Sequence, residues 1–182
     1  IRRAAKEALK RIGDAQIVPF LLQTLKYESD PNVLKDAENA INQISDSDAA
    51  PYFFEALREE SARVRQIAAQ ALGRIGGKDA VAALLALRHD PSLDVRTAVA
   101  AALGEMGDAQ ACPVLLEFLQ DKHPKLRRIA VKGLGRIGTA EAVFPLIQFV
   151  QDDDVGIRQA AVESLGRIGS AEAVPVLMTI LQ

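Results

Sequence analysis

Apolar residues recur at intervals of three and four positions in segments of several helical turns, which is the spacing of an amphipathic α-helix. In residues 92–106 this stripe consists of Val95, Ala98, Val99, Ala102, Leu103 and Met106. A shorter apolar run at residues 80–87 precedes it. Between the two, Asp90 and Pro91 suit the N-cap and the first residue of a helix. The pattern therefore predicts two helices joined by a short turn.

The same helix–turn–helix pattern returns at a fixed interval. Its end is marked by Leu-Gly-x-Ile-Gly at 72–76, 134–138 and 165–169, by Leu-Gly-Glu-Met-Gly at 103–107, and by degenerate copies at 9–13 and 41–45. The first residues of these copies are spaced by 32 residues once and by 31 residues four times. A period of this length is typical of a solenoid, in which each unit buries its apolar face against its neighbours.

We therefore predict an all-α fold, a right-handed α-solenoid of stacked helix–turn–helix units. One solenoid domain is expected over residues 1–182, with about six units at 1–13 (partial), 14–45, 46–76, 77–107, 108–138, 139–169 and 170–182 (partial). Because the chain starts inside a second helix and ends on an apolar helix, we expect a fragment, or the ordered part, of a longer protein. End-to-end self-stacking is the alternative.

Two further columns of residues keep this register. A glycine inside a helix costs about 1 kcal/mol relative to alanine. Its recurrence predicts close approach of a neighbouring helix at Gly73, Gly104, Gly135 and Gly166.

Arginines stand seven residues before the leucine of the corresponding marker, at Arg2, Arg65, Arg96, Arg127 and Arg158. We expect these ladder arginines to hydrogen-bond turn carboxylates and carbonyls of adjacent units, and an anion-binding row is the alternative.

Composition narrows the chemistry. Hydrophobic residues make up 49% of the chain but aromatic residues only 4%, so the core is expected to consist of Ala, Leu, Ile and Val. A net charge of −2 gives no general attraction to nucleic acid or anionic membrane, and no apolar run is long enough for a membrane span. The lone Cys112 lies in an apolar run, which predicts a buried structural thiol. Such low cysteine usage favours a cytoplasmic location.

No catalytic or metal-binding motif stands out. The sequence has no P-loop and no Gly-x-Ser-x-Gly elbow, and Asp152-Asp153-Asp154 predicts a solvated turn with a helix N-cap rather than a cation site. We therefore expect no catalytic residue, no metal and no cofactor.

Residues 64–76, Val-Arg-Gln-Ile-Ala-Ala-Gln-Ala-Leu-Gly-Arg-Ile-Gly, and their three successors resemble the short HEAT-like repeats of the phycobilisome-lyase type. The second unit departs from this pattern, with Leu34 in place of the arginine, Asn42 and Ser45 in place of the glycines, and one extra residue. Proteins similar to this include bilin lyase and chaperone-like subunits, metal-dependent hydroxylases and interaction scaffolds.

The hydroxylases of this kind carry His-Glu pairs just after the ladder arginine, where they hold a di-iron centre. The matching positions here are Gln66-Ile67, Thr97-Ala98, Arg128-Ile129 and Gln159-Ala160. The only histidines, His89 and His123, are expected in turns. Because no His and carboxylate groups converge, the di-iron hydroxylase interpretation is excluded.

In HEAT-like stacks the second helix lines the concave face, so its positions outside the apolar stripe are candidates for partner binding. They fall into three columns that vary from unit to unit: Gln66, Thr97, Arg128 and Gln159; Gln70, Ala101, Lys132 and Glu163; and Arg74, Glu105, Arg136 and Arg167. Arg128, Lys132 and Arg136 follow an i, i+4, i+8 spacing in a segment without acids. A solvated basic face and docking of an acidic protein surface or anionic cofactor both fit, whereas scarce aromatics disfavour nucleic acid.

Two functions follow. The first is a non-catalytic scaffold that binds protein partners on the concave face of the solenoid. The alternative is a bilin lyase or chaperone-like subunit acting on phycobiliproteins, which the resemblance implies and for which a cationic patch could pair carboxylates.

Overall fold

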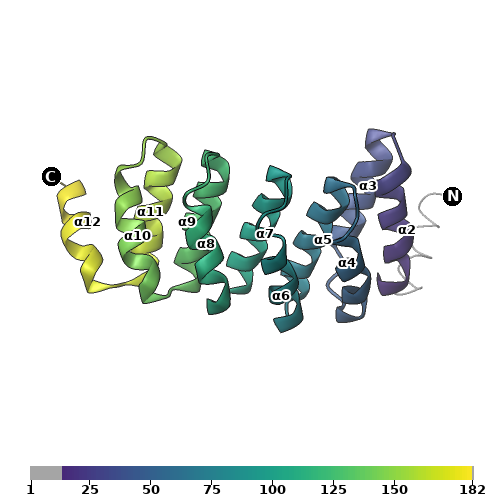
Figure 1. Ribbon diagram of the computed structural model, residues 1–182, viewed down its shortest axis with the longest axis horizontal. Helices are drawn as coiled ribbons and strands as arrows, with labels where there is room; N and C mark the ends of the chain where they lie inside the picture. The colour runs from purple at the N-terminus through teal and green to yellow at the C-terminus, as the bar shows by residue number, and fades with distance from the viewer. Residues whose placement is uncertain (1–13, 182) are drawn as a thin grey trace.

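The computed structural model describes residues 14–181, in which eleven α-helices and no strand stack along one axis (Figure 1). The helices are α2 (Asp14–Tyr27), α3 (Pro31–Asn42), α4 (Ala50–Ala56), α5 (Ala62–Ile75), α6 (Lys78–Ala86), α7 (Leu93–Met106), α8 (Cys112–Phe118), α9 (Pro124–Ile137), α10 (Val143–Gln148), α11 (Val155–Ile168) and α12 (Val174–Ile180). Each full unit expected from the sequence holds one pair, a first helix and a longer or similar second helix. The predicted all-α solenoid is confirmed.

Short 3-10 turns lead into most of the first helices: η1 (Ser47–Ala49), η2 (Ala109–Ala111), η3 (Ala140–Ala142) and η5 (Ala171–Ala173). The carboxylate of Asp108 accepts a hydrogen bond from the Gln110 N–H at 2.8 Å and so caps η2. A further 3-10 turn, η4 (Phe149–Gln151), extends α10. At the other end, α7 stops at Gly107, whose φ of 67° is left-handed and whose N–H donates to the Leu103 carbonyl.

The core is one continuous strip of Ala, Leu, Ile and Val, joined by a few phenylalanines such as Phe53 and Phe118. Cys112 belongs to this strip, since its side chain is buried and its Sγ lies 3.2 Å from Thr139 Oγ1, as expected of a structural thiol. No helix within residues 14–181 has the length and apolar character needed to cross a membrane.

One helix start differs from the expectation. Helix α7 begins at Leu93 with Ser92 as its N-cap, two residues later than Asp90 and Pro91 predicted. Asp90 instead accepts the Ser92 N–H at 2.8 Å with Oδ1 and binds Arg65 with both carboxylate oxygens. The Asp90 carboxylate, which the sequence predicts as the N-cap of α7, is therefore shared with Arg65 of the preceding unit.

Successive second helices touch almost without intervening side chains. A Cβ added to Gly73 would lie 2.5 Å from Ala102 Cβ, and one added to Gly104 would lie 2.6 Å from Gly133 Cα. At Gly135 it would collide with Ser164. The predicted close approach is therefore confirmed at Gly73, Gly104 and Gly135.

Gly166 is the exception, because a Cβ there would meet nothing within 4 Å. The prediction of close approach is wrong at this position. Its three counterparts each face the second helix of the following unit, and among the described residues only the first helix α12 follows α11.

Gly104 and Gly166 provide a matched test of this packing. Gly104→Ala is expected to lower the free energy of unfolding by about 1–2 kcal/mol, because contact with the Gly133 backbone outweighs the gain in helix propensity. Gly166→Ala, the same change in the same register, is expected to raise it by up to about 1 kcal/mol. Urea unfolding followed by circular dichroism measures both, and shifts of the same sign would contradict the packing account.

Candidate functional site

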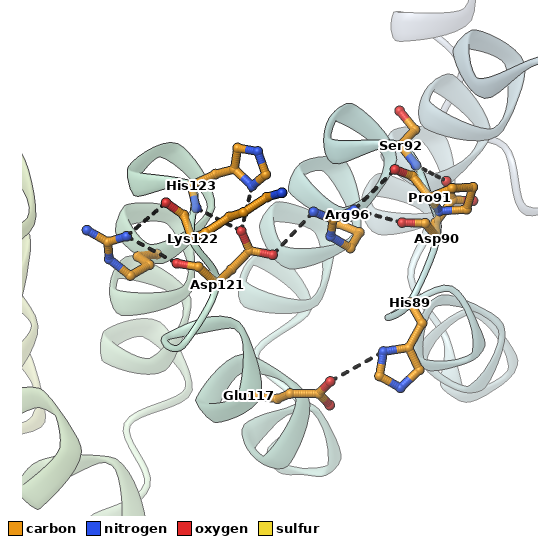
Figure 2. A network of polar contacts seen from close by, with 10 residues as sticks. His89, Asp90, Pro91, Ser92, Arg96, Glu117, Asp121, Lys122 and His123 are labelled. Atoms are coloured by element: carbon orange, nitrogen blue, oxygen red, sulfur yellow. Dashed lines mark hydrogen bonds and ion pairs between the residues drawn. The ribbon is translucent and has the colours of Figure 1, made fainter.

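A polar network runs along the turns that precede the second helices (Figure 2). Arg96, in the first turns of α7, donates from Nη1 to the Asp90 carbonyl of its own turn at 2.8 Å. Its Nη2 donates to Asp121 Oδ2 in the turn of the next unit at 3.2 Å. One guanidinium therefore ties two units together.

The same arrangement recurs at the neighbouring ladder arginines. Arg65 donates to Asp90 with Nε at 2.7 Å and with Nη2 at 3.0 Å. Arg127 binds the Asp121 carbonyl at 3.1 Å and forms an ion pair with Asp152 at 3.7 Å.

Arg158 completes the ladder by binding the carbonyl of Asp152 at 2.7 Å. The expected links between units are confirmed at Arg65, Arg96 and Arg127. Among the described residues Arg158 binds only carbonyls of its own turn, and Arg2 lies outside the described residues. Because the guanidinium groups of Arg65, Arg96 and Arg127 are paired with turn carboxylates, the contacts favour the ladder over the alternative anion-binding row. The acidic run also matches its prediction, since Asp154 is the N-cap of α11 and its Oδ1 accepts the Ile157 N–H.

The ladder is interrupted at Leu34, which is buried in α3 where an arginine would stand. The acid of the next turn, Glu59, is instead paired with Lys26 of α2 at 2.7 Å. The lysine thus takes over the carboxylate that a ladder arginine would bind.

Burial and pairing act in opposite directions on the ladder acids. Burial alone would raise the pKa of Asp90, but the hydrogen bonds from Arg65 and the Ser92 N–H lower it, so the net shift is downward. The pKa of Asp121 is also lowered, because hydrogen bonds from His123 and the charge of Arg96 outweigh the effect of burial. Both carboxylates are therefore held in their charged form.

The predicted partner-binding columns lie on the second helices. Arg74, Glu105, Arg128, Lys132, Arg136, Gln159, Glu163 and Arg167 are exposed, and Gln66, Gln70 and Ala101 are half-buried. Arg74 has a partner in the scaffold, since its Nη2 donates to the Ile41 carbonyl of α3 at 3.2 Å. Burial lowers the pKa of Arg74, and the charge of Glu105 opposes this shift.

Thr97 does not belong to the exposed surface. Its side chain is buried, with 9% relative exposure, and its Oγ1 has no hydrogen-bond partner. Helix α7 packs between α5 and α9, so the short threonine side chain does not reach the solvent as the longer Gln66, Arg128 and Gln159 do in the same column. The expectation that Thr97 is an exposed contact residue is corrected accordingly.

A cavity of about 150 Å³ opens between α9 and α11, lined by Lys132, Arg136, Glu163, Ser164 and Arg167. Three of these five residues are cationic and one is anionic. Among the residues described, none of the three cations forms an ion pair, whereas Glu163 accepts a hydrogen bond from Gln159 at 3.0 Å. Ser164, buried at the cavity, donates to the Val131 carbonyl at 3.0 Å.

Four of the five lining residues were predicted as members of the columns. That they enclose one cavity could not be predicted from the columns, because it depends on how far α11 is offset from α9. Ser164 was missed because its position in the repeat belongs to the apolar stripe. The only signal in the sequence is its polarity. The equivalent positions of the two preceding units hold Ala102 and Gly133, whereas this unit holds a serine.

No group of three or more His, Cys, Asp or Glu side chains that could hold a metal ion occurs in the part of the chain that the structure describes. The two histidines lie in turns, as expected: His123 Nδ1 is 2.7 Å from Asp121 Oδ1, and His89 Nδ1 is 3.4 Å from Glu117 Oε1 (Figure 2).

With this geometry in place, comparison with known families identifies HEAT repeats at residues 1–63, 50–128 and 113–182. The chain belongs to the HEAT-repeat family. Comparison with curated proteins gave no match.

Solved structures place this HEAT-repeat protein among helical solenoids. A chain in the complex of CpcE and CpcF of the phycocyanin lyase from Nostoc sp. PCC7120 is 25% identical, with a TM-score of 0.67 over 83% of the present chain. The present chain spans 64% of the length of that lyase chain. The predicted resemblance to HEAT-like repeats of the phycobilisome-lyase type is confirmed.

Two more distant structures share the fold alone. A designed armadillo repeat protein in complex with the peptide (KR)4 is 19% identical, with a TM-score of 0.62 and coverage of 89% of this chain and 90% of that one. Human deoxyhypusine hydroxylase in complex with glycerol is also 19% identical, with a TM-score of 0.56 and coverage of 93% and 69%.

The ladder predicts a pH-dependent contribution to stability. Asp90→Asn is expected to lower the free energy of unfolding by about 2–3 kcal/mol at neutral pH, because Arg65 loses a buried partner. Since the pKa of Asp90 is lowered in the folded state, its contribution is complete above the ordinary value of about 3.9 and is lost as the pH falls through the folded-state value. The difference in the free energy of unfolding between wild type and Asp90→Asn should therefore become smaller below about pH 4.

Urea unfolding at a series of pH values measures this difference. Asp36→Asn, an exposed aspartate of α3, is the control and should change stability by no more than about 0.5 kcal/mol. A difference for Asp90→Asn that stays constant down to pH values well below the ordinary aspartate pKa would contradict the role given to its charge.

Proposed function

We propose that this HEAT-repeat protein is a non-catalytic scaffold that binds protein partners along the concave face formed by its second helices. The observation that carries the proposal is the row of exposed polar and charged side chains on these helices, which changes from unit to unit on a repeated core.

Packing supports the assignment of this row to the inner side of the stack. The second helices α5, α7, α9 and α11 pack directly on one another, whereas the first helices α4, α6, α8 and α10 make few contacts among themselves. Small residues at Gly73, Gly104 and Gly135 allow this close spacing. A stack with one closely spaced row and one widely spaced row curves toward the closer row, which makes the second helices the inner wall.

The chemistry of this wall supports recognition of an extended partner. Moving along the stack, a ligand meets glutamines on α5, an acid on α7, a run of cations on α9 and a mixed set on α11. Second helices spaced about 8–10 Å apart would bring each new set within reach of successive parts of one ligand. This division between a constant core and a variable face is how repeat proteins build binding surfaces.

Site-specific photo-crosslinking in the cells that produce the protein tests the proposal. A crosslinking residue at Glu105 or Gln159, on the second helices, is expected to capture a partner protein. The same residue at Gln110 or Glu141, exposed in the 3-10 turns that lead into the first helices α8 and α10, serves as the control and should capture little. Capture from the control positions alone, or equally from both faces, would contradict a partner-binding inner face.

A second candidate is a bilin lyase or chaperone-like subunit, which the likeness to the phycocyanin lyase chain favours. The cations Lys132, Arg136 and Arg167 could pair the carboxylates of a tetrapyrrole. Its test is the visible spectrum of a bilin mixed with this protein and apo-phycocyanin: added chromophore supports this candidate, and an unchanged spectrum removes it.

A further inference from the structure

The cations between α9 and α11 differ from several other cations of the second helices, which are paired with acids. On the second helices, Arg63 pairs with Glu38 at 2.8 Å and Lys125 approaches Asp94 at 3.4 Å, and each pair joins two adjacent units. The ladder arginines Arg65, Arg96 and Arg127 likewise bind acids of the following turn. Arg128, Lys132, Arg136 and Arg167 form no ion pair with any residue in the range 14–181.

This arrangement has a cost within the fold. Like charges at i, i+4 positions of a helix repel, and Arg128, Lys132 and Arg136 form two such pairs in succession on α9. The only carboxylate in the cavity, Glu163, is hydrogen-bonded along its own helix by Gln159. Positions that break a local rule without structural compensation are typical of functional sites.

The cations form a line rather than a cluster. Arg128 reaches across to the start of α11, where a Cβ added to Gly156 would lie 3.1 Å from its Nη1. Lys132 and Arg136 continue the line into the cavity, and Arg167 faces them from α11. Residues four apart on a helix rise by about 6 Å, so the line on α9 is about 12 Å long.

An extended peptide matches this spacing. Side chains two residues apart on a β-like segment point the same way and are separated by about 6.6 Å. Carboxylates at alternate positions would therefore follow the 6 Å steps of the cations on α9. An acidic helix would present its carboxylates on a rounded surface, and the groove between two helices suits an extended chain better.

We propose that the groove between α9 and α11 binds an extended segment of a protein partner that carries Asp or Glu at alternate positions. Its carboxylates pair with Arg128, Lys132 and Arg136, and Arg167 closes the far wall of the cavity. This rests on the proposed scaffold function and names the chemistry of the partner. Nucleic acid fits less well, because α9 and α11 contain no aromatic residue on which bases could stack.

Fluorescence anisotropy with a labelled peptide of alternating Asp and Ser tests the proposal. The wild-type protein is expected to bind this peptide, and a peptide of the same composition with its acids in one block should bind several-fold more weakly. Lys132→Glu/Arg136→Glu should weaken binding about tenfold or more, since attraction is replaced by repulsion. The milder Lys132→Gln/Arg136→Gln should weaken it in the same direction.

The matched control is Arg58→Glu/Lys78→Glu, which makes the same change in net charge at two exposed positions outside the second-helix row. Binding should stay within about twofold of wild type if the groove is the site. Circular dichroism of each variant checks that the solenoid is intact.

If the alternating and the blocked peptide bind with equal affinity, the proposed alternate spacing is wrong. If Lys132→Glu/Arg136→Glu and Arg58→Glu/Lys78→Glu lose the same affinity for the alternating peptide, the groove is not the site. Binding of inorganic phosphate or single-stranded DNA without binding of the peptide would overturn the acidic segment as occupant. If the peptide fails while crosslinks from Glu105 and Gln159 still capture a partner, this assignment is wrong and the scaffold function stands.

Discussion

Where α7 crosses α9, Gly104 and Gly133 face each other with no side chain between the two backbones. This contact, repeated as Gly73 on Ala102 and Gly135 on Ser164, brings each second helix against the next one. A glycine in a helix interior costs about 1 kcal/mol of helix propensity. Here the absence of a side chain allows dense packing along one side of the stack. The close row determines which side chains line the inner wall and how far apart they lie.

The arginine ladder fixes the same helices at their other end. Glycine contacts hold the second helices near their C-terminal halves, whereas Arg65, Arg96 and Arg127 connect the turns before them to the turns of the following units. Two anchors per unit leave little freedom for one second helix to slide along the next. Exposed side chains in one column are therefore presented at a regular spacing, which a linear ligand can match.

Periodicity made most of the architecture predictable, because the residues that build each contact recur in every unit. The helix pairs, the ladder and three of the four glycine contacts followed from register alone. What register could not give belongs to a single unit: the burial of the short Thr97, and the cavity at Lys132, Arg136 and Arg167. Both depend on the side chains of one unit, which the repeat average does not contain. The start of α7 is different, because the second helices from α5 to α11 all start in the same register, at positions 62, 93, 124 and 155, so the local Asp90-Pro91 signal was misleading where the register of the repeat was not.

The central claim is that the second helices form the closely spaced, inner row of the stack. Two pairs of spin labels in a Cys112→Ala background measure it directly by double electron–electron resonance. Positions 74 and 167 lie on second helices three repeats apart, and positions 79 and 172 lie three repeats apart in the first turn of α6 and in the 3-10 turn η5 that leads into α12. We predict a separation of about 24–30 Å for the first pair and a longer one for the second. An equal or shorter distance between positions 79 and 172 would contradict the inner placement of the second helices.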